Sequence, residues 1–527
     1  MNERELTEII LCSGIKMDKN YENVLSYSEA DIVNLCRTNA IYTGNKYKIM
    51  GVRNNVINLD CPYGVAMYAN YLAFKNPKYG DKWIFGWVID VKLLNDEVSQ
   101  ITFKTDVFST WYSRFSLNEA FIEREHVDDD TVGKHTIPES LETGEYILNT
   151  STDGNITIGA SSYIVLGISE MPFPISIPTG VRKYNGVFSG LLYVAFETGD
   201  QAEHFIDLMQ SYITQDIIST MFIVPSALIP DITFSSVTFD SNTVTFGYVP
   251  YTDDEVLLGY NIANKMTTLD SYSPVNNKLK VYPYQYLLVD NNAGSSQIYH
   301  YEDWKDTVDD KCNFSVLGAV SPGCAIRIIP TNYKNLGVVD IEGLDAPKLP
   351  TCGWTNDAYT NWLTQNAVNI PLSIATDTLK TIGGAMSGNV GSALGGVSGI
   401  TNTLTQVYEK SLTPQTAKGG VNQGDLTYAR RLGWNLYHYS IRKEYAKSID
   451  AYFSRFGYKV NEVKTPNLNS RTVFNFIKIG GMDELVSGNI PATDLEEINS
   501  IFRKGVTIFH DYTKIGNFSV SNPIRNN

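Results

Sequence analysis

The chain has 527 residues, enough for roughly three or four domains, and its apolar content allows a sizeable buried core. Its formal net charge is −15 and it has no long basic run, which excludes tight binding of nucleic acid by clustered Lys and Arg but not a surface past which DNA slides. The 33 Tyr and 22 Phe favour β-sheets and subunit interfaces.

The beginning of the chain and its cysteines indicate where the protein folds. Acidic residues lie within 1–5, where a signal peptide carries positive charge. No run of about 20 apolar residues occurs, so no conventional membrane-spanning helix is predicted. The six cysteines form no CxxC pair, and we expect reduced, buried thiols in a protein made in a cytosol. They are Cys12, Cys36, Cys61, Cys312, Cys324 and Cys352.

Alternation of apolar and polar residues predicts several β-strands. The odd positions of 83–91 are all apolar, and 101–107 alternates in the same way, with 95–97 as the connecting loop. The sequence therefore predicts a β-rich chain. Similar runs occur at 163–168, 186–196, 232–249, 279–289 and 324–329.

Two segments have the apolar spacing of amphipathic helices. In 441–456 large apolar residues recur every three or four positions, and we expect Gly457 to cap this helix before a strand at 458–460. We interpret both helices as core-packing elements. The other helix follows Thr198 and aligns Phe205, Ile206, Met209 and Tyr212 on one face.

Carboxylates and imidazoles gather in one stretch, 123–130 followed by His135. Neither the HExxH spacing of a zinc site nor the EF-hand spacing occurs there, so we expect a charged surface loop rather than a metal site. The GxSxG motif, the phosphate-binding loop ending in Lys and the dinucleotide fingerprint are also missing from the sequence. We therefore expect no catalytic residue, no cofactor and no enzymatic activity.

The segment 367–407 differs in composition from the rest of the chain. Asp377 and Lys380 are its only charged residues, and its centre, 382–400, carries seven glycines. Small residues four positions apart let helices approach closely in membranes, whereas in water this composition lacks the large side chains that anchor a core. Composition leaves two interpretations open. One is a linker or closely packed helix inside an assembly, and the other is a membrane-active loop.

Several strings resemble one protein family. The segment 103–111 (FKTDVFSTW), followed by 121–127 (FIEREHV), is similar to the N-terminal signature of tail knob proteins of small, short-tailed phages that infect Gram-positive bacteria. The resemblance is weaker from 148 to about 276, and Phe509 precedes His510 where members often carry Trp. Further similar strings are 282–292, 352–363, 443–446, 452–460 and 466–471.

The resemblance implies a fold that is mainly β with some α. It implies several tail-tube or hub-like β-domains that form a ring, most simply a hexamer, with the apolar Gly-rich segment as an insertion. It further implies that this insertion plugs the distal end of the tube before infection and then penetrates the host cytoplasmic membrane. The residues expected to carry this role are Ile382, Gly384, Met386, Gly388, Val390, Gly391, Leu394, Gly395, Val397, Gly399 and Ile400.

The expected organisation has four parts. These are an N-terminal tube-wall domain (1–147), a middle β-rich region (148–350), the insertion (351–420) and a C-terminal segment that completes the wall (421–527). The expected function is a structural virion protein at the tail tip, assembled in the host cytoplasm and serving as a conduit for genome ejection. Its expected partners are copies of itself, other tail and collar proteins, the host membrane and viral DNA, which an acidic lumen would let pass without specific binding.

Two other functional classes are considered. A receptor-binding or tail-fibre-type adhesion protein is the alternative, since such proteins are also rich in β-structure and tyrosine. It would have no use for an apolar Gly-rich insertion between structured segments. A tail-associated cell-wall hydrolase would need a catalytic grouping that the sequence does not contain.

Overall fold

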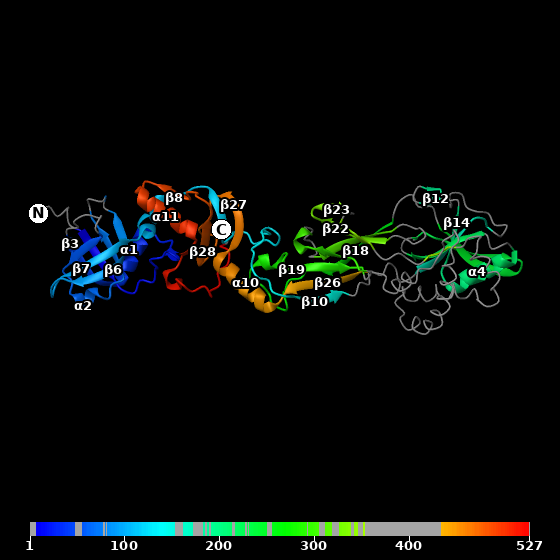
Figure 1. Cartoon of the computed structure of the whole chain (residues 1–527), viewed down its shortest axis with the longest axis horizontal. Helices are drawn as coiled ribbons and strands as arrows, with labels where there is room; N and C mark the ends of the chain where they lie inside the picture. Colours follow the sequence, from blue (N-terminus) through cyan, green and yellow to red (C-terminus); the bar gives the residue numbers. More distant parts are fainter. Residues whose placement is uncertain are drawn as a thin grey trace, which may run out of the picture. The chain divides into compact units, whose positions relative to one another are not determined.

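The computed structural model divides the chain into two compact units, which are described separately (Figure 1). Unit 1 comprises Met1–Gly144, Tyr272–Leu279 and Lys443–Asn527, and unit 2 comprises Glu145–Ser271 and Lys280–Arg442. Each unit is therefore built from segments that are distant in sequence. The structure describes residues 7–47, 55–76, 80, 82–152, 162–171, 183–184, 187–188, 191–212, 217–226, 229, 231–249, 256–291, 294–304, 311–318, 326–338, 342–345, 351–353 and 434–525.

Unit 1 contains a six-stranded antiparallel sheet whose order is β3-β1-β5-β6-β7-β4. The predicted strands at 83–91 and 101–107 are confirmed as β6 and β7, and 95–97 lies in the loop between them. The strands are β1 (Thr7–Cys12), β3 (Ala40–Tyr47), β4 (Val56–Leu59), β5 (Tyr71–Lys75), β6 (Trp83–Leu93) and β7 (Ser99–Thr105), and the accompanying helices are α1 (Glu29–Thr38), α2 (Tyr63–Ala66) and α3 (Val107–Trp111).

The alternation within β6 is reversed at Ile89, which the sequence pattern places on the buried side. Trp87 is buried, but Ile89 is 52% exposed. The register passes from Val88 to Asp90 on β6 while β7 advances by a single residue, so Ile89 forms a β-bulge. A bulge adds one residue and turns the following side chains to the opposite face. The expectation for Ile89 is therefore wrong.

Strand β7 ends earlier than the alternation at 101–107 predicts, because Asp106 begins a helix. The Asp106 carboxylate caps α3 by accepting a hydrogen bond from the Ser109 N–H at 3.1 Å. It also accepts the Tyr71 hydroxyl at 2.7 Å, and burial raises the pKa of this carboxyl. The string at 103–111 thus combines a strand end, a helix cap and a short buried helix.

The second sheet of unit 1 brings together the two ends of the chain. Its order is β2-β30-β28-β9-β27, with β2 parallel to β30 and β9 antiparallel to both β27 and β28. In Figure 1 the orange-to-red elements β27, β28 and α11 belong to the same unit as the blue sheet. The elements are β2 (Asn23–Leu25), β8 (Phe115–Leu117), β9 (Ala120–Glu125), α10 (Lys443–Phe456), β27 (Tyr458–Lys464), β28 (Phe474–Ile479), β29 (Val486–Gly488), α11 (Ala492–Lys504) and β30 (Val506–Phe509); β8 pairs with β29.

The predicted C-terminal helix is confirmed as α10, although Ile441 belongs to the preceding strand. Gly457 follows the helix with a φ of 66°, as expected of a glycine cap. A Cβ atom at this position would meet the backbone carbonyl of Glu125 on β9. Glycine is therefore required both by the turn and by the close approach of the two segments.

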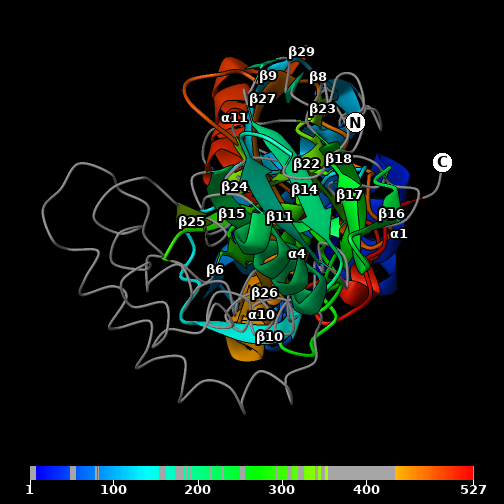
Figure 2. The same cartoon turned by 90° about the vertical axis from the view of Figure 1, so that its right-hand side faces the viewer.

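Unit 2 is built around a six-stranded sheet of order β16-β17-β14-β11-β15-β25, with helix α4 on one face (Figure 2). Leu166 and Val194 pack with α4, whereas their neighbours Val165 and Ala195 enter a second core that also receives residues of the other sheets. The sheet is therefore buried on both faces. Its elements are β11 (Ser162–Ile168), β14 (Leu192–Phe196), α4 (Gly199–Tyr212), β15 (Ile218–Pro225), β16 (Phe234–Phe239), β17 (Asn242–Tyr248) and β25 (Thr351–Gly353).

Two further sheets complete the described part of unit 2, with a short pair of β12 and β13. One has the order β10-β26-β19-β20, and the other has the order β18-β21-β22-β23 with β24 paired to β22. Their strands are β10 (Tyr146–Thr152), β12 (Lys183–Tyr184), β13 (Val187–Phe188), β18 (Val256–Asn264), β19 (Gln285–Asp290), β20 (Ser296–Tyr299), β21 (Lys311–Gly318), β22 (Ile326–Tyr333), β23 (Leu336–Val338), β24 (Leu344–Asp345) and β26 (Asn435–Ile441). The 3₁₀ helices within the described residues of both units are η4 (Tyr112–Arg114), η7 (Asn277–Lys280), η8 (Tyr301–Asp303) and η10 (Tyr512–Lys514).

Most of the predicted elements of unit 2 are confirmed. The runs at 163–168 and 232–249 are β11 and the β16–β17 hairpin, and the helix after Thr198 is α4 with Phe205 buried. The run at 279–289 is a strand only from Gln285 onward, since a 3₁₀ helix and a turn precede it. The run at 186–196 divides into β13 and β14, and that at 324–329 continues as β22.

The prediction of a mainly β, multi-domain chain with some helix is confirmed. The expectation of unpaired, buried thiols is confirmed for four of the cysteines. These are Cys12, Cys36, Cys61 and Cys312.

Candidate functional site

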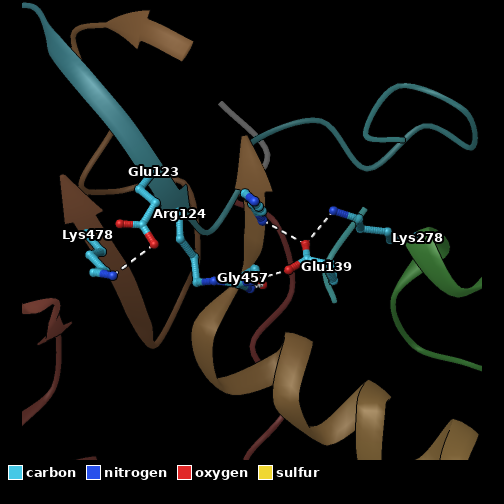
Figure 3. Close-up of polar contacts among 7 residues, drawn as sticks. Glu123, Arg124, Glu139, Lys278, Gly457 and Lys478 are labelled. Atoms are coloured by element: carbon cyan, nitrogen blue, oxygen red, sulfur yellow. Dashed lines mark hydrogen bonds and ion pairs between the residues drawn. The ribbon is translucent and has the colours of Figure 1, made fainter. Parts of the chain in front are cut away.

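A buried cluster of charged side chains joins three separate segments of unit 1 (Figure 3). At its centre the Glu139 carboxylate accepts hydrogen bonds from the Arg124 guanidinium and the Lys278 ammonium. The same carboxylate accepts the Lys459 backbone N–H at 2.8 Å. Arg124 also donates to the Gly457 carbonyl at 2.7 Å, where α10 ends. We call these five residues the Glu139 network.

The two cations of the Glu139 network are positioned by different elements. Arg124 belongs to β9 and Lys278 to η7, and both cations lie over aromatic rings of the C-terminal segment. The side chains of Glu139 and Lys278 are 0% and 2% exposed. Burial lowers the pKa of Lys278, and the Glu139 carboxylate opposes that effect. Because desolvated charges are costly when unpaired, the network favours one arrangement of the three segments.

A second buried carboxylate, Asp450 of α10, holds the segment 272–279. It accepts the Tyr272 hydroxyl at 2.7 Å. It also accepts the backbone N–H groups of Val275 at 2.8 Å and Asn276 at 3.0 Å. These bonds dock a short piece from the middle of the chain onto a C-terminal helix.

The stretch 123–130 is not the charged surface loop that the sequence suggests. Arg124, Glu125 and His126 are buried, because β9 is paired on both sides within its sheet. The Glu125 carboxylate accepts a hydrogen bond from the Lys464 ammonium at 2.5 Å, and burial raises the pKa of Glu125. Among the described residues, no group of three or more His, Cys, Asp or Glu side chains is placed to hold a metal ion.

Glu123 at the start of this stretch and 128–130 at its end are partly exposed, and the carboxylates of Asp129 and Asp130 have hydrogen-bond partners. The Asp129 carboxylate accepts from the Lys134 ammonium at 2.7 Å, which with Thr131 holds the pKa of Asp129 below its usual range. The His135 Nε2 atom lies 2.8 Å from the Asp129 carbonyl oxygen. Asp130 accepts the Tyr458 hydroxyl at 2.6 Å. The cluster is a structural junction.

The buried imidazole of His126 is satisfied in its neutral form. Its Nδ1 atom accepts the Phe476 N–H at 2.7 Å, so Nε2, which lies 3.1 Å from the Ser454 carbonyl oxygen, carries the proton. Burial lowers the pKa of His126 to about 3, and Arg471 contributes to the decrease. A second proton would break the bond to the Phe476 backbone.

Unit 1 is therefore expected to lose stability as pH falls below the ordinary histidine pKa. The unfolded chain takes up a proton at His126 from about pH 6.5 downward while the folded chain does not, so this contribution is complete above pH 6.5. It should decrease by up to about 1.4 kcal/mol per pH unit as pH falls towards the folded value. Urea unfolding of wild type and His126→Gln between pH 7 and about pH 4.5 measures the slope.

The matched control for this experiment is His204, which is exposed on α4. The variant His204→Gln should resemble wild type in unfolding, because this side chain is exposed. His126→Gln should show a shallower dependence of the unfolding free energy on pH than wild type, with His510, whose pKa burial also lowers, contributing to the remainder. Equal slopes in His126→Gln and wild type would contradict the assignment.

The predicted plug residues, from Ile382 to Ile400, lie outside the described residues, as does the whole of 354–433. Within the part of the chain that the structure describes, no helix is long and apolar enough to cross a bilayer. The sequence reasoning missed the Glu139 network, since Glu139 lies outside the acidic stretch and Lys278 is distant in sequence. The unusual density of charge at 123–130 is the one signal that pointed towards this region.

Two family models match this chain, one near its N-terminus and one over its second half. Residues 251–523 match the model of the C-terminal domain of tail knob protein gp9 of Bacillus phage phi29. Residues 5–116 match the model of the caudoviral major tail protein N-terminus.

Comparison with whole proteins finds relatives that match over nearly the full length of both chains. The chain is 24% identical to tail knob protein gp9 of Bacillus phage phi29 and 22% identical to that of Bacillus phage PZA, each over 98% of this chain and 99% of the relative. Among solved structures, that of the bacteriophage C1 tail knob protein gp12 matches with a TM-score of 0.65 at 14% sequence identity, over 99% of this chain and 100% of the other. At that identity the match shows a shared fold.

Proposed function

Since the chain belongs to the family of tail knob protein gp9 of phage phi29, and is thus a structural component of a phage tail, we propose that it forms the distal knob as a ring around the channel through which the genome is ejected. The observation that carries the proposal is the match of nearly the whole chain to nearly whole tail knob proteins, in sequence and in fold. The relatives reported above all bear that name, which favours this function over the receptor-binding alternative.

In this proposal unit 1 supplies the tube wall. The match of residues 5–116 to a major tail protein N-terminus covers the strands of its first sheet, and the second sheet adds the C-terminal segment to the same unit. The proposed parts follow those expected from sequence, with wall segments at 1–147 and 421–527, a middle region at 148–350 and the insertion at 351–420, except that β26 (Asn435–Ile441) belongs to unit 2. The insertion closes the channel until infection and then enters the host cytoplasmic membrane.

The partners proposed for the ring follow from its place in the tail. They are five further copies of the chain, the adjoining tail and collar proteins, and viral DNA that passes without specific binding. The net charge of −15 supports free passage, because an acidic wall repels phosphates. The protein acts without catalysis or cofactor in this proposal, and the pairing of the charged groups of the Glu139 network supports a structural role for that cluster.

Electron microscopy of the purified, assembled protein tests the proposal. We expect a closed ring with six-fold symmetry and a central channel wide enough for duplex DNA, lined more by acidic and polar than by basic side chains. Native mass spectrometry should give six times the mass of the chain. A monomer in material taken from virions, or a channel lined mainly by Lys and Arg, would contradict it.

A further inference from the structure

A pocket of about 530 Å³ in unit 1 has a buried lysine in its wall. Lys82, immediately before β6, is only 4% exposed. Its Nζ atom has no hydrogen-bond partner among the residues that the structure describes. A buried ammonium normally has acceptors, because leaving a charged donor without one is costly. Because Lys82 lines the pocket, the pocket is the place from which an acceptor could reach its ammonium.

The tryptophan beside Lys82 is held in a fixed position. The Lys82 Nζ atom lies 3.0 Å from the centroid of the Trp111 ring, and the Trp111 Nε1–H donates to Asp494 Oδ2 at 2.8 Å. The face of an aromatic ring attracts a cation, but it does not provide the hydrogen-bond acceptor that a carboxylate oxygen would provide. Burial lowers the pKa of Lys82 to about 7, with Arg114 contributing, while Glu29 and Asp494 oppose the decrease.

The other charged groups of the pocket already have partners. Lys104 pairs with Glu497 at 2.8 Å, and Asp494 accepts from Trp111. Among the described lining residues, the charged group without a hydrogen-bond or ion-pair partner is therefore the Lys82 ammonium, which lies in the same lining as the carboxylates of Asp494 and Glu497. A singly charged acceptor suits such a site. A phosphate dianion does not, since its second charge would lack a cation and face two carboxylates.

The remaining walls decide what the acceptor is attached to. Ile84 and Val107 line the pocket together with the Trp111 ring. Asn55, Thr105 and Thr110 also line it, so apolar side chains stand beside several polar groups, as in many sites that bind small ligands. The body of the ligand is therefore expected to be apolar, with its charge at one end.

We propose that this pocket binds a carboxylate with a short apolar body, whose oxygens accept hydrogen bonds from Lys82 and whose carbon chain packs against Trp111. The same chemistry occurs in a free carboxylic acid and in an acidic side chain of another polypeptide. Binding favours the protonated amine, so the affinity should decrease as pH rises through about 7.

Calorimetry with butyrate on the full-length assembled protein at about pH 6.5 tests the proposal. Lys82→Met removes the ammonium but keeps an unbranched side chain. Lys92→Met is the control, because Lys92 is exposed on β6 and does not line the pocket. We expect Lys82→Met to raise the Kd of butyrate about tenfold or more, the value of one charge-assisted hydrogen bond. The control should leave the Kd nearly unchanged, and 1-butanol and inorganic phosphate should bind at least about tenfold more weakly than butyrate.

Two further measurements complete the test. If Lys82→Met does not fold, lysine ¹³Cε NMR of the wild-type protein replaces it, since saturating butyrate should raise the pKa of Lys82 from about 7. Blocked peptides Ala-Glu-Ala and Ala-Gln-Ala separate the sources: preference for the Glu peptide over butyrate assigns the ligand to a polypeptide side chain, and the reverse assigns it to a free acid. The proposal is overturned if neither butyrate nor the Glu peptide binds. It is also overturned if Lys82→Met binds butyrate as tightly as wild type, or if saturating butyrate leaves the pKa of Lys82 unchanged.

Discussion

Deletion of 367–407 is expected to abolish the release of dye from liposomes by the assembled protein, while the ring still forms. Asp377 and Lys380 are the only charges in this segment. Since each charge at the bilayer centre costs about 2.5–3.5 kcal/mol on insertion scales, the segment avoids most of the cost of entering a membrane. Fluorescence release measures leakage, and electron microscopy of the same sample measures assembly.

Point variants within the insertion test whether leakage depends on close packing of the small residues or only on the hydrophobicity of the segment. Its glycines weaken a single membrane span, so we expect several copies to pack through the small residues at 384, 388, 391, 395 and 399. In the free particle these copies should meet on the channel axis, which hides apolar surface from water. The double variant Gly391→Leu and Gly395→Leu should reduce leakage, although it increases hydrophobicity. Ser398→Ala is the control and should have a smaller effect.

Two other outcomes of the deletion experiment would contradict the proposed role of this segment. Should it release dye as well as the intact protein does, the segment is a linker and the plug residues have no membrane role. Should the deletion prevent ring formation, the segment belongs to the assembly interface. Either result would leave the family assignment untouched, since that depends on the rest of the chain.

Replacement of Glu139 by Ala is expected to lower the free energy of unfolding of unit 1 by about 3–5 kcal/mol, the usual cost of breaking a buried ion pair from one side. The reason is that Arg124 and Lys278 would both lose their carboxylate while remaining buried. Denaturant unfolding followed by the fluorescence of Trp111, compared with a Trp111→Phe background, reports the change in this unit.

The controls for Glu139→Ala use both a neighbour and a partner. Glu142 is exposed, so Glu142→Ala should change stability by less than about 0.5 kcal/mol. Adding Lys278→Met to Glu139→Ala should recover part of the loss, since one uncompensated cation is then removed. If Glu139→Ala is as stable as wild type, or if Lys278→Met adds its full separate cost, the network does not hold these segments together.

Local patterns predicted the elements whose neighbours are close in sequence. The period-two runs gave the positions of β7 and β11, and the three-to-four spacing gave α4 and α10 with its cap at Gly457. These predictions succeed because alternation and helical spacing follow directly from backbone geometry. They fail at Ile89, where a bulge reverses the faces of β6, and before Gln285, where buried apolar residues do not form a strand.

The burial of polar groups, in contrast, was not predicted from local sequence patterns. The charges at 123–130 suggest a solvated loop, yet Arg124 and His126 are buried, because their partners Glu139 and Ser454 are supplied from elsewhere in the chain. A carboxylate or imidazole tolerates burial only when donors or acceptors converge on it. That convergence has no signature in a single local window.

The sequence by itself determined the class of the protein: mainly β, acidic, without a recognisable catalytic motif, and with strings similar to tail knob proteins. It also singled out the insertion, because composition is visible without a fold. The tertiary structure alone decided that β2 pairs with β30, that 272–279 docks on α10, and that Lys82 is buried without an acceptor among the described residues. Each of these depends on contacts between residues far apart in the chain, and the free energy of such contacts exists only once the intervening chain has folded.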